Sequence, residues 1–182
     1  KKDSAMITEK PYAVKILEKD SIYFSAEKIF AFQKADTADV KKKKSFLRAF
    51  YKARMYKSNA QAKADSISFN ETDGIMHLFH KPILWSGEKQ VSGDKIEAYF
   101  NSDSENIDSL KVVGNAFAIS KADSLNLKDE FNQVKGKLMS VYYQDGEVKL
   151  AKVIGNAQAI NYADDQNEKT KQTERIGVAI SS

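Results

Sequence analysis

The amino-acid sequence predicts an all-β protein, and an internal repeat is the strongest reason. The segment Val153-Ile-Gly-Asn-Ala-Gln-Ala-Ile-Asn161 repeats Val112-Val-Gly-Asn-Ala-Phe-Ala-Ile-Ser120. The preceding segments repeat as well, because residues 134–143 match residues 91–100 in their apolar, glycine and aromatic positions. The copies lie 43 residues apart at the first segment and 41 at the second. Self-similarity at this period is typical of stacked supersecondary units, none of which buries its apolar face alone.

Strands are predicted where apolar and polar residues alternate between turn signals. The alternation is clear at Asp65-Ser-Ile-Ser-Phe69, and the Asp-Gly pairs at residues 73–74 and 145–146 predict tight turns between strands. Lys81-Pro82 ends the strand before it. The expected strands cover residues 50–56, 65–69, 75–80, 83–85, 91–100, 112–120, 134–143 and 153–161.

Three segments are less regular. Residues 40–56 can be drawn as a basic amphipathic helix, but their place in the repeat favours a strand instead, most naturally at Phe50–Tyr56. Residues 57–62 are then expected to be an insertion, and the polar residues 168–175 a loop. The run Lys41–Lys44 could contact phosphates of nucleic acid or lipid, but we favour a solvated loop, because charge runs are usually surface features.

A ladder of short strands predicts an open-ended roll or solenoid whose strands turn one face inward. The inward set is apolar and partly aromatic, so the interior is either a packed core or an apolar channel, and periodicity does not separate the two. The inward face is predicted to hold Phe69, Leu78, Ile96, Phe100, Phe117, Leu127, Met139, Val141 and Val153.

Composition limits the class of protein. The chain of 182 residues is 42% hydrophobic and 30% charged, which is enough apolar material for a core. No apolar run approaches the roughly 18 residues that a spanning helix needs. The chain starts at Lys1 without a methionine, and the strand-like segment Ile176–Ile180 stands at its end, so we expect a fragment of a longer protein.

The sequence offers no convincing set of catalytic residues. The chain has no cysteine and two histidines, His77 and His80, whose spacing puts them on opposite faces of a strand. The recurrent aspartates, such as Asp65 and Asp123, stand at the starts of strands. They are expected to form hydrogen bonds within turns rather than to act as a catalytic acid and base. We therefore expect no enzymatic activity, no cofactor and no metal site.

Five phrases, in order along residues 20–162, resemble the OstA-like proteins of Bacteroidetes, relatives of the lipopolysaccharide-transport proteins LptA and LptC and of the periplasmic part of LptD. The phrases are Lys63-Ala-Asp-Ser-Ile-Ser-Phe-Asn70, Lys81-Pro-Ile-Leu-Trp85, Val91-Ser-Gly-Asp-Lys-Ile96, Phe131-Asn-Gln-Val-Lys-Gly136 and Val153-Ile-Gly-Asn-Ala-Gln-Ala-Ile160. The run Lys41–Lys44 departs from the family pattern.

The resemblance implies stacked antiparallel strands in an open, twisted β-jellyroll of the LptA/OstA type. It implies one OstA-like domain over residues 1–182, with repeat units at about 20–62, 91–120 and 134–161. It also implies a non-catalytic periplasmic protein of a Gram-negative cell that carries lipopolysaccharide acyl chains in an apolar groove towards the outer membrane. The predicted inward residues would then line the lipid path.

The partners implied are lipopolysaccharide and other Lpt-type β-jellyroll proteins that pair through edge strands, with end-to-end self-association and without nucleic acid. The alternative is a structural β-repeat adaptor that pairs with partner proteins through its edge strands and binds no lipid. A nucleic-acid binder built around residues 41–54 is a third and more distant hypothesis.

Overall fold

The computed structural model of the chain describes residues 3–18, 20–35, 43–101, 106–122, 130–166 and 173–181. These residues form strands joined by turns, with no helix among them, and all their strand pairings are antiparallel. The strands are β1 (Asp3–Thr8), β2 (Tyr12–Ile16), β3 (Ser21–Ser25), β4 (Lys28–Ala35), β5 (Lys43–Lys57), β6 (Ala60–Asn70), β7 (Ile75–Phe79), β8 (Ile83–Ser86), β9 (Lys89–Ser92), β10 (Lys95–Phe100), β11 (Ile107–Lys121), β12 (Phe131–Gln144), β13 (Glu147–Ile154), β14 (Gln158–Gln166) and β15 (Thr173–Ser181). The prediction of an all-β fold is confirmed.

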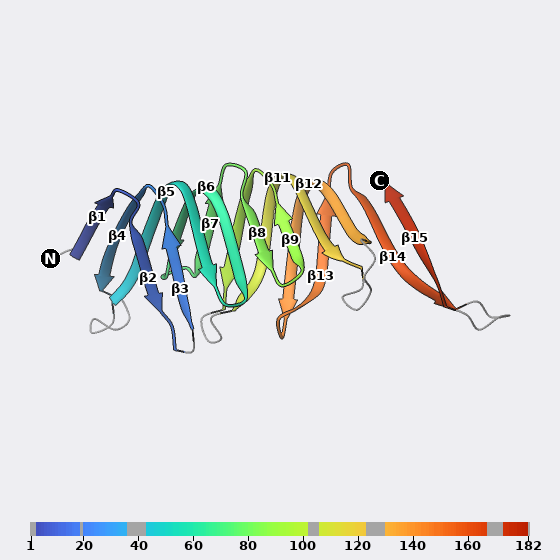
Figure 1. Cartoon of the computed structure of the whole chain (residues 1–182), viewed down its shortest axis with the longest axis horizontal. Coiled ribbons are helices and arrows are strands. Elements are labelled where there is room, and N and C mark those ends of the chain that lie inside the picture. The colour runs from blue at the N-terminus through green and yellow to red at the C-terminus, as the bar shows by residue number, and fades with distance from the viewer. Residues whose placement is uncertain are drawn as a thin grey trace.

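The strands follow one another along the long axis and build two walls, one in front of the other in Figure 1. The front wall contains β2, β3, β8, β9, β14 and β15, and the back wall contains β1, β4, β7, β10 and β13. The long strands β5, β6, β11 and β12 belong to both walls, because each bends once and continues in the other. For example, β11 pairs with β10 through residues 107–113 and with β9 through residues 117–120.

One edge of the roll is closed by a corner, where the chain passes from wall to wall (the upper edge in Figure 1). The corner is made largely by pairs of consecutive residues with positive φ. These pairs are Glu9-Lys10, Tyr51-Lys52, His80-Lys81, Gly114-Asn115 and Gly155-Asn156. The two Gly-Asn pairs of the sequence repeat are therefore corner bends. Glycine suits them because φ is +73° at Gly114 and +80° at Gly155, which a side chain makes costly.

Backbone hydrogen bonds continue around this corner. Asp65 N donates to His80 O at 3.4 Å, His80 N donates to Asp94 O at 3.1 Å, and Asp94 N donates to Gly114 O at 2.9 Å. The bends therefore leave these backbone groups paired, and the roll closes along this edge without a break in its ladder.

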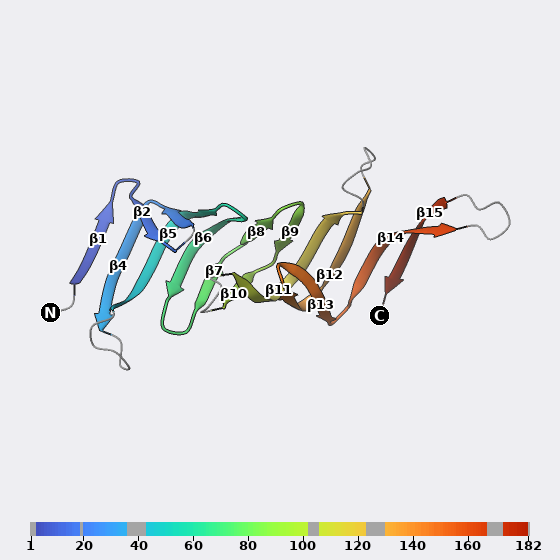
Figure 2. The same cartoon turned by 90° about the horizontal axis from the view of Figure 1, so that it is seen from below.

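The opposite edge is an open seam, where turns of the two walls face each other (Figure 2). No strand pairing joins the walls on this side in the part of the chain that the structure describes. Two ion pairs cross it instead. Lys15 Nζ lies 2.7 Å from Glu71 Oε1, and Lys89 Nζ lies 3.0 Å from Glu147 Oε2.

The middle of the interior is solidly packed. Residues directly opposite one another on neighbouring strands form a continuous inward row of the back wall, and each is at most 1% exposed. The row is Ile29, Ala49, Ile67, Leu78, Ile96, Val112 and Met139. Burial of such a row is the main apolar stabilisation of the fold, at about 25 cal/mol per Å².

Three expectations from the sequence are wrong in detail. Residues 60–62 are not an insertion, because they begin β6 and pair with β5. Lys43 and Lys44 lie in β5 rather than in a loop, while residues 41 and 42 lie outside the described residues. Residues 173–175 belong to β15. In each case cross-strand pairing overrides a local pattern that is polar or lacks a period.

Candidate functional site

Six of the predicted inward residues lie on the inner face of the back wall. Leu78, Ile96, Met139 and Val153 belong to one cross-strand row, in which each residue stands opposite the next strand's member. Phe69 and Val141 belong to the neighbouring row, together with Met76, Ala98 and Leu110. All of these residues are buried except Val153, which is half-buried against the core.

Phe100 lies further towards the open seam, half-buried against the same core. Its ring meets the ring of Phe69 edge to face, with centroids 6.0 Å apart and an interplanar angle of 85°. Such a pair adds stability beyond its buried area. Phe100 therefore joins the packed centre to the seam.

Phe117 does not face inward, and this prediction is wrong. Ala116 and Ala118 take the inward positions of β11, because Ala118 stands directly opposite the buried Val91. Since side chains alternate along a strand, Phe117 lies on the outer face, opposite Ser92 and Lys135. The other predicted residue, Leu127, lies outside the described residues.

The interior is hollow towards the N-terminal end. A cavity of about 750 Å³ lies between β1, β4 and β5 of the back wall and β2 and β3 of the front wall. Its lining is mostly apolar and aromatic, with Ala13, Phe24, Leu47 and Phe69 among its members. Lys15 also lines it and is the member that reaches across to Glu71.

A second hollow opens towards the C-terminal end. It measures about 420 Å³ and lies between β12 and β13 on one side and β9, β11 and β14 on the other. Met139, Val141 and Tyr143 line it from the back wall, and Val91 and Ala159 from the front wall. Burial raises the pKa of the Tyr143 phenol, which keeps this group neutral.

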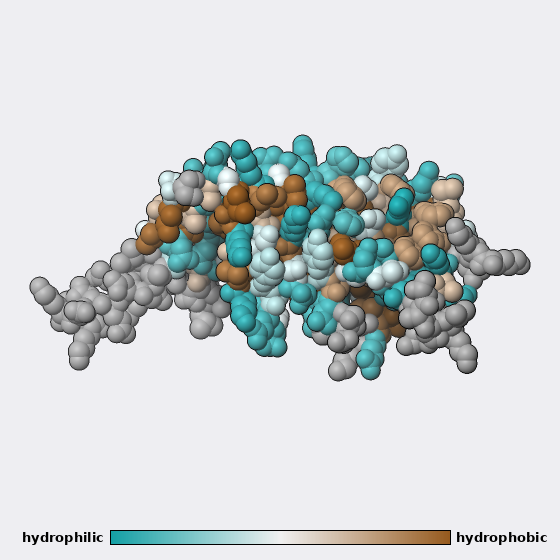
Figure 3. Space-filling view, turned by 180° about the vertical axis from the view of Figure 1, so that it is seen from behind, coloured by the Kyte–Doolittle hydropathy of each residue, from teal (hydrophilic) through white to brown (hydrophobic). Residues whose placement is uncertain are grey.

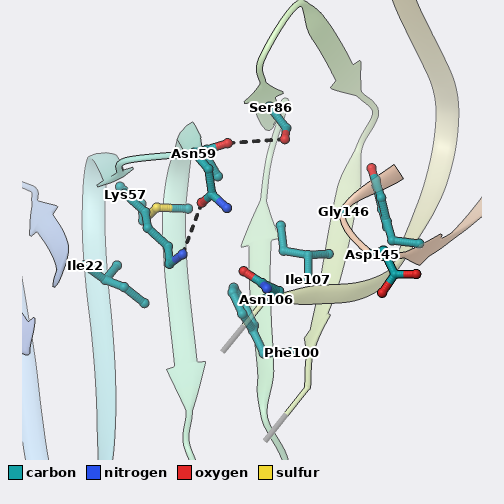
Figure 4. A pocket seen from close by; sticks show the side chains of 12 residues that line it. Ile22, Lys57, Asn59, Ser86, Phe100, Asn106, Ile107, Asp145 and Gly146 are labelled. Carbon is teal, nitrogen blue, oxygen red and sulfur yellow. Dashed lines mark hydrogen bonds between the residues drawn. The ribbon is translucent and has the colours of Figure 1, made fainter. Parts of the chain in front are cut away.

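The third cavity lies at the open seam, between these two hollows. It measures about 160 Å³ and is lined by turns of both walls (Figure 4). Phe100, Ile107 and other apolar side chains lie at the inner side, and Lys57 projects into it. The Lys57 ammonium donates to Asn59 Oδ1 at 3.1 Å and lies 3.5 Å from Asp20 Oδ2. Lys57 is the one charged residue that is buried in the described part of the chain.

The clearest electrostatic feature of the seam is Glu71. Burial raises the pKa of this carboxyl, but hydrogen bonds from Lys15 Nζ at 2.7 Å and from Ser45 N at 2.6 Å lower it. The net effect is a pKa below the ordinary value, so the Glu71 carboxyl is ionised at neutral pH and can pair with the Lys15 ammonium. Sequence reasoning missed this pair, because 56 residues separate its members and neither stands in a repeated motif.

The histidines take no part in this interior. His77 faces outward on the back wall, where its Nδ1 lies 3.6 Å from Glu97 Oε1, and His80 belongs to the corner. No group of three or more metal-ligating side chains occurs among the residues that the structure describes. Over the same residues, no helix is long and apolar enough to cross a membrane.

The site is therefore an apolar interior with a packed centre, hollow ends and a polar seam. Residues 14–104, half of the 182-residue chain, match a family model described as LptA/(LptD N-terminal domain) LPS transport protein. The match runs from β2 to just beyond β10, which covers most of the N-terminal hollow and most of the packed centre. No curated protein matches the chain. The chain belongs to the family of LptA and LptD N-terminal-domain lipopolysaccharide transport proteins.

Proposed function

We propose that the protein is a non-catalytic lipopolysaccharide carrier of the Gram-negative periplasm, which holds acyl chains between its two walls on their way to the outer membrane. The observation that carries this proposal is the pair of apolar hollows at the two ends of the roll. Family membership supplies the class of cargo.

The sizes of the hollows suit this role. At about 750 and 420 Å³, both fall within the range of small-molecule binding sites. Acyl chains need a path without water, and each Å² of apolar surface that they bury stabilises the complex by about 25 cal/mol. The phosphorylated head groups would stay at the open seam, where they would replace the carboxylates that pair with Lys15, Lys57 and Lys89 and accept charge-assisted hydrogen bonds.

The packed centre shapes the proposed mechanism. The two hollows are separated by side chains such as Ile67, Leu78 and Ile96, each fully buried. An acyl chain that passes from one end to the other must therefore part the walls. The open seam is where they part, because ion pairs and side-chain contacts join the walls there in place of a backbone ladder.

The same packed centre favours a second candidate function. A roll with a solid middle can serve as a structural adaptor, which pairs with partner proteins through its edge strands and binds no lipid. The two candidates differ in one respect that can be measured: only the carrier places lipid against inward side chains.

Photo-crosslinking in cells tests the choice. A photoreactive amino acid at position 100 or 141 replaces an inward side chain at the seam or in the C-terminal hollow. Positions 97, 99 and 117 are matched outward controls on the strands β10 and β11. We expect lipopolysaccharide to be captured at positions 100 and 141 and not at the three controls.

Equal capture on both faces would contradict a specific interior path. Capture of a partner protein without any lipid at positions 100 and 141 would favour the adaptor. The measurement is an immunoblot of the crosslinked product for lipopolysaccharide, with far-ultraviolet circular dichroism of each purified variant as the control for folding.

A further inference from the structure

The outer face of the front wall carries a group of aromatic and basic side chains that the interior does not need. We call it the aromatic-basic patch. Phe24, Met55 and Ala62 are the buried members of β3, β5 and β6, so their neighbours along each strand point outward. The patch consists of Tyr12, Tyr23, Arg54, Tyr56, Lys63 and Trp85.

Strand register brings the patch together from five strands. Tyr23 stands opposite Tyr56, and Tyr56 stands opposite Gln61, whose other neighbour is Trp85. These strands, β2, β3, β5, β6 and β8, are adjacent in the N-terminal half of the front wall (Figure 1). Arg54 and Lys63 stand opposite each other in the next row.

The rings form a concave lining rather than a flat row. The centroids of Tyr12 and Tyr23 lie 5.9 Å apart at 39°, and those of Tyr23 and Tyr56 lie 6.1 Å apart at 51°. Lys63 Nζ lies 5.5 Å from the centroid of the Trp85 ring, and Trp85 Nε1 donates to Gln90 Oε1 at 2.8 Å. Together they border a shallow hollow of about 350 Å³.

The patch is exposed and positively charged. Tyr12 is 64% exposed and Tyr56 is 51% exposed, which is far more than packing on the sheet requires. Neither Arg54 nor Lys63 forms an ion pair with a carboxylate in the part of the chain that the structure describes. By contrast, the outer face of the back wall pairs several of its charges, for example Lys95 with Glu97 at 2.6 Å.

We propose that the aromatic-basic patch is a binding site for an acidic saccharide. One face of a sugar ring presents C–H bonds, which are attracted to the negative face of an aromatic ring. Arg54 and Lys63 supply charge-assisted hydrogen bonds for a carboxylate or phosphate on the sugar. The amide of Gln61, at the centre of the row, both donates and accepts, as recognition of hydroxyl groups requires.

Single-stranded nucleic acid is recognised by the same residue types, but the geometry favours the saccharide. Successive bases stack on aromatic side chains that are spread along a positively charged groove, which follows the nucleic-acid backbone. Here the tyrosine rings are tilted against one another and surround a single hollow of small-molecule size.

The site lies on the outside of the roll, so it does not depend on lipid in the interior. A saccharide without any acyl chain therefore tests it separately from the carrier function. Trp85 is the single tryptophan of the chain and lies within the patch, so its fluorescence reports on occupancy.

The experiment titrates the protein with tetragalacturonic acid, with the neutral maltotetraose and with an octamer of thymidylate. We expect a saturable change in Trp85 fluorescence with tetragalacturonic acid and an affinity at least about tenfold lower for maltotetraose. Arg54→Gln and Lys63→Gln should each weaken binding of the acid by about tenfold. Tyr56→Ser should weaken binding of both sugars.

Lys111→Gln and Tyr51→Ser are the matched controls, because both side chains are exposed and neither lines the hollow of the patch. They should leave the affinity unchanged. The proposal is overturned if tetragalacturonic acid gives no saturable change, if the thymidylate octamer binds more tightly than the sugar, or if Lys111→Gln weakens binding as much as Lys63→Gln does. Circular dichroism confirms that each variant is folded.

Discussion

At the scale of single residues, the ion pair between Lys15 and Glu71 is the contact best placed to hold the two walls together near the N-terminal hollow. Its side chains are 24% and 33% exposed, whereas those of the pair between Lys52 and Glu27 at the corner are 82% and 48% exposed. Water screens the second pair more strongly, so the two pairs are expected to differ in their contribution to stability.

Glu71→Gln tests this contribution. The pKa of Glu71 is lower in the folded chain than its ordinary value of 4.5. The ionised carboxylate therefore stabilises the fold above about pH 4.5, and this contribution is lost as the pH falls through the folded-state pKa. We expect Glu71→Gln to lower the free energy of unfolding by about 1 kcal/mol at pH 7. The difference from the wild type should shrink below about pH 4.

Urea unfolding at pH 7 and at pH 3.5 measures both values, and Glu27→Gln is the control for an exposed pair. The control should change stability little at either pH. A loss for Glu71→Gln that persists undiminished at pH 3.5 would show that the amide disturbs packing and that the ion pair is not the cause.

At the scale of elements, the corner bends decide which residues face inward. In β6 the buried positions are Ala62 and Ala64 before the corner and Ile67 and Phe69 after it, so the inward parity changes at Asp65. A strict alternation of inward and outward residues, applied along the whole of β6, misses this change of face. The bends also let one strand serve two walls, which gives each long strand two sets of neighbours.

The sequence predicted the positions of strands and turns better than it predicted which side chains of a strand face inward. The Asp-Gly pairs located turns, because these depend on local backbone conformation. The repeated Gly-Asn pairs were placed inside expected strands, but they are the bends at residues 114 and 155. Phe117 was misassigned because equivalence between repeats does not determine which side of a bent strand faces inward. The seam residues Lys15, Lys57 and Glu71 could not be found, since they meet only when distant turns are brought together.

The same bends support a matched pair of glycine substitutions. Gly114 and Gly146 both have positive φ, at +73° and +82°. A Cβ at Gly114 would meet the carboxylate of Asp94, which accepts a hydrogen bond from Asn115 Nδ2 at 3.0 Å, whereas a Cβ at Gly146 would meet nothing within 4 Å. Both alanine variants should lose about 1 kcal/mol from the backbone conformation, and Gly114→Ala about 1 kcal/mol more from the displaced carboxylate.

Urea unfolding of the two variants under one condition measures the difference, in which the shared backbone cost cancels. Equal losses would contradict a crowded corner and would leave positive φ as the whole reason for glycine there.

At the scale of the whole molecule, the two ends of the roll are formed by different edge strands, and both strands expose apolar side chains. At the N-terminal end β1 is an edge strand, with Met6 65% and Ile7 49% exposed. At the C-terminal end β15 pairs only with β14 among the described strands, with Val178 46% and Ile180 63% exposed. Exposed apolar side chains also gather towards the two ends of the back wall, whereas the middle of that wall is more polar (Figure 3).

Unpaired backbone groups on such edges are a template for pairing with another chain. Because the two ends differ, a contact between the N-terminal edge of one molecule and the C-terminal edge of the next is heterologous, and it repeats without closing. We therefore expect molecules to associate end to end along the long axis. Small-angle scattering or sedimentation over a concentration series should show growth in length at a constant cross-section.

Val178→Pro tests whether β15 is the contact. Main-chain pairing tolerates many side chains, so Val178→Ala, which keeps the backbone donor, should associate nearly as the wild type does. Proline removes that donor and should lower association much more strongly. Equal effects of the two substitutions would show that the Val178 side chain and not its backbone makes the contact. A particle that stays monomeric at the highest concentration would contradict end-to-end self-association, and it would favour a module that pairs through its edge strands with a different partner.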